Sequence, residues 1–303
     1  MNIADICKRF LHWDTVEVEP VQSGTSNTLY KVNSNASVAL VRVYGPRSDQ
    51  FYDPAYEQLT FQQLSEVGLA PRTLAKGNGW RIEEFIDGVP LLREELVLPS
   101  TLALIAVNLA RLHKVPLAPR EPVSLSRLRC WGHVAPPYIQ AELAAMTRSL
   151  SKPHFLYDVV FSHNDVQENN MIRTATGLRL IDFEYADFNY RGADVGNLFN
   201  EVCYDYTIST PPYFRETSSY PTPEVQRWFA AAYLSEWLET PVYESTHADQ
   251  IAAFLSEVHV FSQLSHLLWG LWALIRAEHT EIAFDFRKYA AIRFEAYFRN
   301  SIT

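Results

Sequence analysis

The sequence predicts an α+β fold in two lobes, a β-rich N-terminal lobe at residues 1–88 and a mainly helical C-terminal lobe at residues 89–303. Two observations support this division. Before residue 87, short runs of β-branched and aromatic residues are separated by turn-forming Gly, Asn and Ser. After residue 89, long segments repeat apolar residues at helical spacing. Hydrophobic residues make up 48% of the 303, which is enough for the large core that two lobes need.

The N-terminal lobe is expected to begin with an amphipathic helix or an ordered tail at residues 1–13, and three strands follow. Residues 15–20 alternate apolar and acidic side chains like an edge strand, and residues 28–33 and 38–44 form a hairpin around Asn33-Ser34-Asn35. The turn-forming cluster Ser23-Gly24-Thr25-Ser26-Asn27 connects the first two strands. Such a loop can close over nucleotide phosphates, whereas the alternative is an ordinary three-stranded meander.

A charged residue interrupts the third strand. Arg42 lies between Val41 and Val43, so its side chain points to the opposite face of the sheet. A guanidinium binds phosphate with two parallel hydrogen bonds, which makes Arg42 a candidate phosphate ligand; a solvated strand residue is the alternative. A helix is expected at residues 54–68, with Pro near its start and Gly at its end. Glu57 in its first turns is a candidate partner of Arg42, although the helix dipole alone favours Glu there.

The C-terminal lobe is expected to consist mainly of helices. Residues 159–161 form a short strand within it, and residues 171–173 and 178–181 form a hairpin around Gly177. The expected helices are residues 99–113, 135–150, 224–239, 251–276 and 285–298, and the expected loops are residues 115–123 and 205–223.

Three polar residues follow the short strands. Asp165 ends the run His163-Asn164-Asp165, Asn170 comes five positions later, and Asp182 follows the hairpin. In kinase-like folds, an Asp at this place takes the proton of the substrate hydroxyl, and an Asn and a second Asp hold Mg²⁺. We therefore predict that Asp165 is the catalytic base and that Asn170 and Asp182 bind Mg²⁺, whose other ligands the phosphates of ATP supply. A lone Asp-x4-Asn pattern would mean little, but this ordered set after a β-rich lobe is specific.

The strand expected at residues 80–86 indicates where adenine would bind. It ends at the turn Asp87-Gly88-Val89-Pro90, where a two-lobed kinase has its hinge. We expect backbone groups of Glu84, Phe85 and Ile86 to meet the adenine ring, a prediction that rests on the order of the elements alone.

Departures from protein kinases favour a small substrate. The loop at residues 23–27 has one glycine instead of three, and Phe183-Glu184 follows Asp182 where protein kinases have Phe-Gly. Asp194, which starts the next helical pattern, comes twelve positions after Asp182, so no long activation segment fits between them. A protein substrate would therefore have no platform, and a small molecule is expected.

Two tryptophans indicate what kind of small molecule could bind. Trp269 and Trp272 are three positions apart in a long apolar helical pattern, so they share one helix face. Core packing is one explanation. The other is an aromatic cage for a quaternary ammonium group, which binds to aromatic faces by cation–π attraction.

The composition limits the partners and the location. The net charge of −9 argues against nucleic acid and suits a cationic substrate. Three scattered cysteines, Cys7, Cys130 and Cys203, indicate a reducing compartment and no metal site. The first residues show no basic region followed by an apolar run, and the apolar stretch 260–275 is too short to span a membrane. We expect a cytoplasmic protein without membrane insertion.

Over about residues 20–300 the chain resembles the choline/ethanolamine kinase family. The specific motifs are His163–Asn170, Ile181–Tyr185, Asn189–Gly192 and Asp194–Asn197, with Glu201, Tyr204–Tyr206, Trp269–Trp272 and Arg293–Phe298 after them, and weaker matches at 24–27, 40–45 and 83–86. The resemblance implies a two-lobed protein-kinase-like fold and ATP- and Mg²⁺-dependent phosphorylation of choline to phosphocholine, the first step of phosphatidylcholine synthesis by the CDP-choline route. It also implies a homodimer, because the family is usually dimeric.

The resemblance also implies roles for single residues. Asp165 would be the base, and Asn170 and Asp182 the Mg²⁺ ligands. ATP would be bound by Ser26, Asn27 and Arg42. The ammonium pocket would be lined by Gln167, Tyr185, Glu201, Tyr206, Trp269, Trp272 and Tyr289.

The choice of amino alcohol stays open. Gln167 and Tyr204-Asp205-Tyr206 are similar to choline kinases, whereas Asn200-Glu201 and Ala283–Phe286 are similar to ethanolamine kinases. A full aromatic cage favours choline, with ethanolamine as a second substrate or as the alternative. An aminoglycoside-type phosphotransferase shares the Asp-x4-Asn pattern but needs a wide acidic pocket. A pseudokinase without activity is disfavoured, since Asp165, Asn170 and Asp182 are all present.

Overall fold

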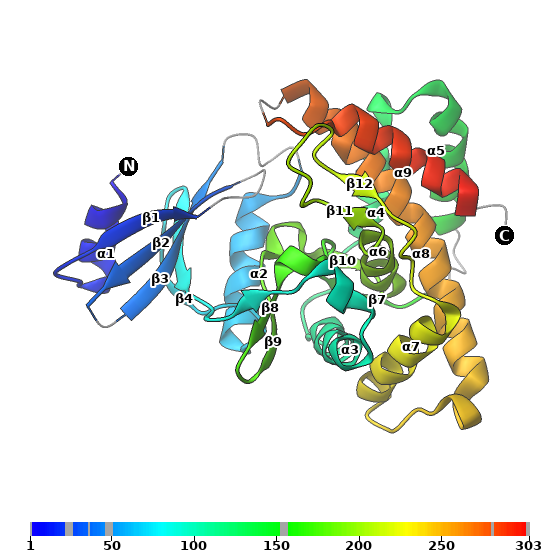
Figure 1. Cartoon of the computed structure of the whole chain (residues 1–303), viewed down its shortest axis with the longest axis horizontal. Helices are drawn as coiled ribbons and strands as arrows, with labels where there is room; N and C mark the ends of the chain where they lie inside the picture. The colour runs from blue at the N-terminus through cyan, green and yellow to red at the C-terminus, as the bar shows by residue number, and fades with distance from the viewer. Residues whose placement is uncertain are drawn as a thin grey trace. The chain divides into compact units, whose positions relative to one another are not determined.

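The computed structural model describes residues 2–21, 27–35, 37–45, 51–151, 157–279 and 282–300 (Figure 1). The chain divides into two compact units. Unit 1 comprises residues 1–89 and 172–185, and unit 2 comprises residues 90–171 and 186–303. The first boundary lies next to the predicted one at residues 88 and 89. The segment 172–185 groups with the β-rich unit, although it comes much later in the chain.

Unit 1 is built on a five-stranded antiparallel sheet. Its strand order is β1-β2-β3-β5-β4, so β1 lies at an edge, as the sequence predicts. The strands are β1 (Glu17–Val21), β2 (Asn27–Ser34), β3 (Ser37–Tyr44), β4 (Thr73–Gly77) and β5 (Trp80–Glu84). Strand β4 was not predicted, and β5 ends two residues earlier than expected.

Two helices belong to unit 1. Helix α1 (Ile3–Leu11) buries Ile3 and Cys7 against apolar side chains of the sheet. Helix α2 (Pro54–Glu66) begins where Asp53 accepts hydrogen bonds from the backbone N–H groups of Ala55 and Tyr56, and Pro54 suits the first helical position. These caps explain why the predicted helix starts at Pro54.

The segment 172–185 contains the predicted hairpin. Strand β8 (Met171–Thr174) and strand β9 (Gly177–Leu180) form it around Gly177, and β6 (Val89–Pro90) is the third strand of this small sheet. A 3₁₀ turn, η5 (Phe183–Tyr185), follows and packs on α2, where the rings of Phe61 and Phe183 meet edge to face at 6.2 Å. This contact holds the residues next to Asp182 against α2.

Unit 2 is mainly helical. Its longest helix, α8, packs on α6, α7 and α9, and α3 packs on α7. The helices are α3 (Pro99–His113), α4 (Val123–Trp131), α5 (Pro137–Leu150), α6 (Gly192–Glu201), α7 (Pro223–Leu238), α8 (Glu244–His279, kinked at His247) and α9 (Phe286–Asn300). Strand β7 (Val159–Ser162) pairs with β10 (Asp187–Tyr190), and β11 (Tyr204–Asp205) pairs with β12 (Arg215–Glu216). Helix α4 and the pairing of β11 with β12 were not predicted.

Glycines allow the helices of unit 2 to pack closely around α8. A Cβ atom at Gly196 of α6 would lie 2.5 Å from the backbone nitrogen of Ser262, and one at Gly270 would collide with the ring of Phe294 in α9. Any larger residue would push these helices apart, so the two glycines bring polar residues of α6 and α9 within reach of α8.

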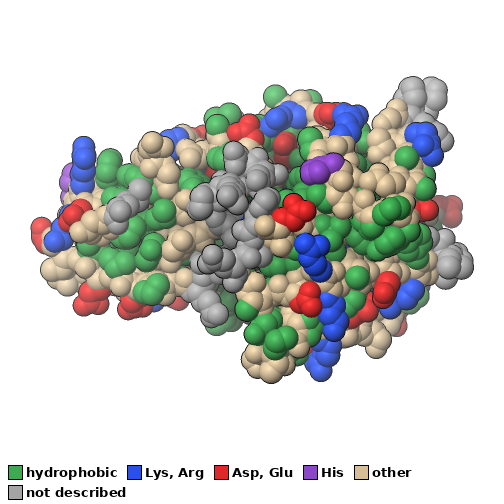
Figure 2. Space-filling view, turned by 90° about the horizontal axis from the view of Figure 1, so that it is seen from above, with side chains coloured by type: hydrophobic (Ala, Val, Ile, Leu, Met, Phe, Trp, Pro, Cys, Tyr) green, Lys and Arg blue, Asp and Glu red, His purple; other side chains and the backbone are tan. Residues whose placement is uncertain are grey.

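Helix α8 passes a length and composition test for a membrane span. Among the described residues it is the one such helix, over Glu244–Glu278, with a mean hydropathy of 1.3. However, 72% of its most apolar window is buried inside unit 2, as in the core helix of a folded protein. Figure 2 shows Lys and Arg side chains mixed with Asp and Glu among the described residues of one face, without a continuous basic field.

Candidate functional site

A buried network of charges lies in unit 1. Arg42 on β3 is directly opposite Arg81 on β5, and Oε1 of Glu83 accepts a hydrogen bond from the Nε atom of each arginine at 3.0 Å. Nη1 of Arg81 lies 2.9 Å from Glu57, and its guanidinium stacks 3.5 Å from the ring centre of Phe61. The question that the sequence left open, whether Arg42 pairs with Glu57, is therefore answered: Glu57 pairs with Arg81. Arg81 points toward α2 and forms the ion pair with Glu57. Arg42 pairs with Glu83, which it shares with Arg81.

The arginines hold Glu83 in its charged form. Burial by itself raises the pKa of Glu83, but the charges of Arg81 and Arg42 outweigh burial and keep this pKa below its ordinary value. For Glu57, burial is the stronger effect and raises the pKa, although Arg81 opposes it. Glu83 is thus the anion that separates two like charges on neighbouring strands.

Arg42 also contacts the segment after the hairpin. Its Nη1 atom lies 2.9 Å from Oδ1 of Asp182, whose backbone has a φ of 60° in the left-handed region, which Asp tolerates better than most residues. Burial tends to lower the pKa of Arg42, but Asp182 and Glu83 overcome this and raise it. Nearby, Nδ2 of Asn27 donates to Glu184 at 2.7 Å, and its amide oxygen accepts from the backbone of Gly45 at 3.2 Å.

The other residues predicted to bind ATP are Ser26, Glu84, Phe85 and Ile86. Ser26 lies outside the described residues. The backbone N–H of Glu84 already donates to the carbonyl of Arg72 at 2.8 Å, so this N–H group has a partner within the protein. The ring of Phe85 lies 4.8 Å below Nζ of Lys31, and Ile86 follows β5 with its side chain half-buried. An adenine contact at Glu84–Ile86 stays a prediction.

In unit 2, a tight loop after β7 carries Asp165. Nδ2 of Asn170 donates to the backbone carbonyl and to Oδ2 of Asp165, both at 2.9 Å, and Gln167 lies 3.4 Å from both carboxylate oxygens. Asn164 has a φ of 64° and donates to the carbonyls of Ser162 and Asp187. The structure therefore brings Asn170 next to Asp165, as predicted from their spacing, and it places Gln167 beside them, which the spacing did not predict.

The loop is anchored by a residue whose role the sequence analysis missed. Asp194 in the first turn of α6 is fully buried and accepts hydrogen bonds at 2.7 Å from the backbone N–H groups of His163 and Asn164. Nε2 of His113 lies 3.1 Å from the same carboxylate, and its Nδ1 lies 2.7 Å from the hydroxyl of Tyr233. Since a carboxylate only accepts, Nε2 of His113 donates to Asp194.

These partners keep Asp194 charged. Burial alone raises the pKa of Asp194, but the hydrogen bond and charge of His113, with the backbone of His163, lower it below its ordinary value. The available signal in the sequence was an aspartate in the first turn of a helix, three residues before Asn197.

A polar cluster joins the end of α6 to α9. Nη1 of Arg293 lies 2.7 Å from Oε1 of Glu201 and 3.0 Å from the hydroxyl of Tyr289. The hydroxyl of Tyr206 donates to Oε2 of Glu201 at 2.8 Å and lies 3.0 Å from that of Tyr289. The four side chains close a ring of hydrogen bonds, and it contains three of the predicted ammonium-pocket residues. Arg293 was not predicted.

The tryptophan pair on α8 connects to the loop of Asp165. Trp269 and Trp272 meet edge to face with ring centres 5.2 Å apart. Nε1 of Trp269 donates to Oδ1 of Asn197 at 2.7 Å, and Nδ2 of Asn197 donates to the carbonyl of Val166 at 3.3 Å. Trp272 also meets the ring of Phe286. The last predicted pocket residue, Tyr185, belongs to unit 1, where its buried ring meets Tyr52 at 6.0 Å.

The donor atoms fit a hard cation. No group of three or more His, Cys, Asp or Glu suited to a metal occurs among the residues that the structure describes. The amide nitrogen of Asn170 donates to Asp165, so the amide oxygen of Asn170 can bind another partner. Asp182 offers a carboxylate. Oxygen atoms from two side chains, with phosphates and water completing the shell, are what Mg²⁺ requires in phosphoryl-transfer sites. By the chemistry of its oxygen atom, each of these two side chains therefore suits Mg²⁺, and that they bind one ion together stays a prediction.

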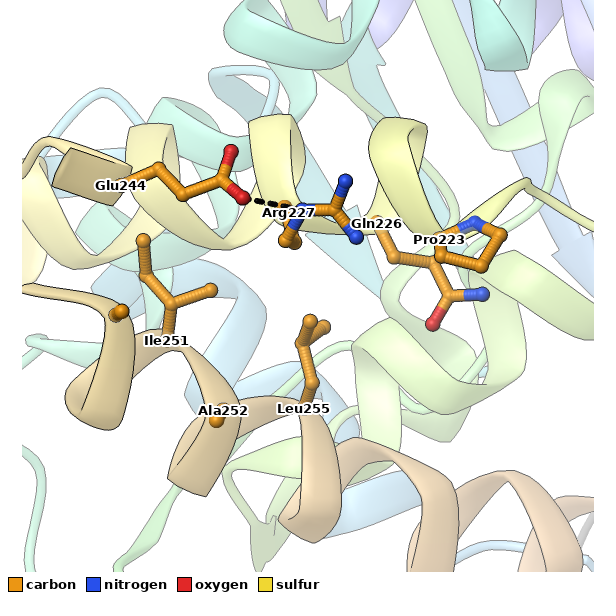
Figure 3. A pocket seen from close by; sticks show the side chains of 8 residues that line it. Pro223, Gln226, Arg227, Glu244, Ile251, Ala252 and Leu255 are labelled. Carbon is orange, nitrogen blue, oxygen red and sulfur yellow. Dashed lines mark ion pairs between the residues drawn. The ribbon is translucent and has the colours of Figure 1, made fainter.

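A hollow of about 160 Å³ lies elsewhere in unit 2. It is bordered by α7 and the first turns of α8, with Ile251, Ala252 and Leu255 on one side and the ion pair of Arg227 with Glu244 (2.6 Å) on the other (Figure 3). None of the predicted site residues lines it, so it is not the predicted ammonium pocket.

Family models and curated proteins give a consistent comparison. The model of the family described as choline/ethanolamine kinase matches residues 18–298. Three mouse proteins are similar to this chain along most of their length. The protein named choline/ethanolamine kinase is 30% identical, over 94% of this chain and 80% of the relative. Choline kinase alpha is 31% identical (96% and 78%), and ethanolamine kinase 1 is 30% identical (95% and 85%). The identity of these three relatives, which are named after one or both amino alcohols, is therefore the same within one percentage point.

Solved structures are similar in fold. The choline kinase from Cryptosporidium parvum Iowa II has a TM-score of 0.87 at 30% identity, covering 99% of this chain and 94% of that one. An aminoglycoside phosphotransferase in a ternary complex with streptomycin and ATP has a TM-score of 0.58 at 13% identity, covering 99% and 97%. The protein-kinase-like fold predicted from the sequence is confirmed.

Proposed function

The chain belongs to the choline/ethanolamine kinase family, and we propose that within it the protein transfers the γ-phosphoryl group of ATP to the hydroxyl of choline. The observation that carries this proposal is in unit 2. There, the loop of Asp165 is tied through Asn197 to the tryptophan pair, so a candidate base and an aromatic surface share one hydrogen-bonded framework. Phosphocholine would be the product, as the first intermediate of phosphatidylcholine synthesis.

Asp165 is the proposed base. Its carboxylate is half-buried and is held by Asn170 and Gln167, so its direction is set before the substrate arrives. A carboxylate placed in this way accepts the proton of the substrate hydroxyl and orients the oxygen for in-line attack, which lowers the barrier mainly through positioning.

The remaining phosphoryl-transfer roles are assigned from each residue's chemistry. We propose that Asn170 and Asp182 are oxygen ligands of Mg²⁺, which when bound neutralises charge on the β- and γ-phosphates. Arg42 would bind phosphate oxygen atoms, and its ion pair with Glu83 holds the guanidinium in place for this. Ser26, Asn27 and the backbone at Glu84–Ile86 stay proposed contacts of ATP.

Choline is preferred to ethanolamine on physical grounds. Trimethylammonium has no N–H group, and it binds through cation–π attraction to Trp, Tyr and other aromatic faces. The proposed pocket residues are mainly aromatic (Tyr185, Tyr206, Trp269, Trp272 and Tyr289), with Gln167 and Glu201 as polar members. Ethanolamine kinase is the second candidate, because a relative with that name is as similar as one named choline kinase.

The test is a comparison of substrates. The purified protein with ATP and Mg²⁺ should phosphorylate choline with a kcat/KM at least about tenfold above that for ethanolamine, a difference of about 1.4 kcal/mol. Equal values would make it a kinase of both, and a preference for ethanolamine would favour the second candidate. Turnover of an aminoglycoside but of neither amino alcohol would refute both. We also propose a cytoplasmic homodimer, which fractionation and light scattering can test.

A further inference from the structure

We propose that Arg293 is a positioning residue that sets the selectivity of the amino-alcohol site, because it neutralises Glu201 and so favours a quaternary over a primary ammonium group. The inference rests on the proposed function, since it concerns which ammonium group that site prefers. Arg293 begins the C-terminal motif Arg293–Phe298, to which the resemblance assigned no role.

Arg293 is a fully buried cation with specific partners. Its exposed fraction is 0%, and besides Glu201 and Tyr289 it donates from Nη2 to Oγ of Ser265 at 2.8 Å. The guanidinium also lies over the ring of Tyr204 at 4.9 Å. Burial tends to lower the pKa of Arg293, but Tyr289, Tyr204 and Glu201 more than compensate and raise it. Arg293 is therefore a buried cation at neutral pH.

Each oxygen atom of Glu201 already accepts one short hydrogen bond. Arg293 takes Oε1 at 2.7 Å and the hydroxyl of Tyr206 takes Oε2 at 2.8 Å. A primary ammonium group offers three N–H donors and gains most from a carboxylate with an open acceptor and an uncompensated charge. Trimethylammonium has no donor to lose, so it gains from the aromatic rings without needing that acceptor. When Arg293 neutralises Glu201, the primary ammonium group of ethanolamine loses the attraction of a free carboxylate, whereas the trimethylammonium group of choline loses less.

The contacts of Arg293 extend to the reacting end of the site. Ser265, which accepts from Arg293, donates in turn to Oδ1 of Asn197 at 2.8 Å. The same atom of Asn197 accepts from Trp269, and its amide nitrogen holds the carbonyl of Val166, the residue after Asp165. Arg293 therefore supports an aromatic residue and the loop of the base through one chain of hydrogen bonds.

The test measures kcat and KM for choline and ethanolamine in Arg293→Gln. We expect the ratio of kcat/KM for choline to that for ethanolamine to fall about tenfold, which corresponds to about 1.4 kcal/mol. Arg293→Lys keeps the positive charge but loses the planar guanidinium with its several N–H donors. It should therefore lower stability while changing the ratio of kcat/KM for choline to that for ethanolamine less than about threefold. A tenfold change in Arg293→Lys would contradict the argument from charge.

Two controls separate selectivity from stability. Arg299→Gln, on the same helix but exposed and paired with Glu216, should leave the ratio unchanged. In a Glu201→Gln background, adding Arg293→Gln should change the ratio less than about twofold, because the charge that Arg293 neutralises is gone and the two effects are not additive. This double variant leaves no unpaired buried charge, so it is expected to fold even if Arg293→Gln does not.

The outcomes distinguish this inference from the proposed function. Wild-type protein that phosphorylates neither amino alcohol would overturn the proposed function itself. Wild-type protein that is active, with an unchanged ratio in Arg293→Gln, would overturn the role of Arg293 alone. An equal loss of kcat/KM for both substrates together with a lower melting temperature would show that Arg293 is only structural.

Discussion

The replacement Asp194→Asn should separate the anchor of the loop from the base that the loop carries. Asp194 accepts two backbone hydrogen bonds of 2.7 Å and one from His113 at 3.1 Å, all fully buried. Asparagine keeps one acceptor oxygen but presents an NH₂ group to at least one of these donors. Breaking a buried charged network by removing one partner costs about 3–5 kcal/mol. We expect a loss of stability in that range.

The loss of the anchor should also reduce activity. If the backbone at His163 and Asn164 shifts, Asp165 shifts with it, and a displacement of about 1 Å at a reacting group can cost about a hundredfold in rate. Urea unfolding followed by tryptophan fluorescence gives the stability, and initial rates with choline give kcat. Asp249→Asn, an exposed replacement of the same kind on α8, is the control. A variant of Asp194 within about 1 kcal/mol of the wild type, with normal kcat, would refute the reasoning.

The same residue predicts a pH dependence. The pKa of Asp194 is lower in the folded protein than its ordinary value, so the folded state favours the charged form. Its contribution to stability is therefore fully present above the unfolded pKa, about 3.9, and is lost as the pH falls through the lower, folded pKa. Asp194→Asn should remove this part of the acid dependence, and urea midpoints between pH 3 and pH 7 measure it. A variant with the wild-type slope would contradict it.

Three further predictions concern the proposed roles. Asp165→Ala should abolish phosphoryl transfer while ATP still binds by calorimetry; near-normal turnover would exclude Asp165 as the base. Trp269→Ala or Trp272→Ala should raise KM for choline more than for ethanolamine, because only trimethylammonium depends on the aromatic faces alone; equal changes would indicate core packing. Glu83→Gln should destabilise the protein by about 3–5 kcal/mol, since Arg42 and Arg81 lose the anion between them, whereas Glu84→Gln, at the more exposed pair with Arg72, should cost under about 1 kcal/mol in urea unfolding.

The sequence was sufficient wherever a local rule decides the structure. The helix at Pro99–His113 and the hairpin around Gly177 lie where spacing and turn residues predicted them. The proximity of Asp165 and Asn170 followed from a short loop, since residues five positions apart within one loop stay close to each other. Helix α4 was missed because its apolar residues, such as Leu125 and Leu128, directly follow a loop with three prolines.

Partners that are distant in the chain could not be predicted. The sequence left open whether Glu57 pairs with Arg42, because the orientation of Arg81, the actual partner, depends on how β5 and α2 pack. Arg293 was overlooked for a similar reason. Nothing in its own helix indicates that Glu201, ninety-two positions earlier, lies 2.7 Å away.

The sequence by itself determined the family and the kind of chemistry, and it led to the residues that we propose for that chemistry. Those properties depend on residue types that are close together in the sequence, and such residues stay close in space however the rest of the chain packs. Only the tertiary structure decided which charges compensate one another and what holds the loop of Asp165. Asp194, Glu83 and Arg293 are buried ions, and a buried ion is stable only when the fold brings its partner to it.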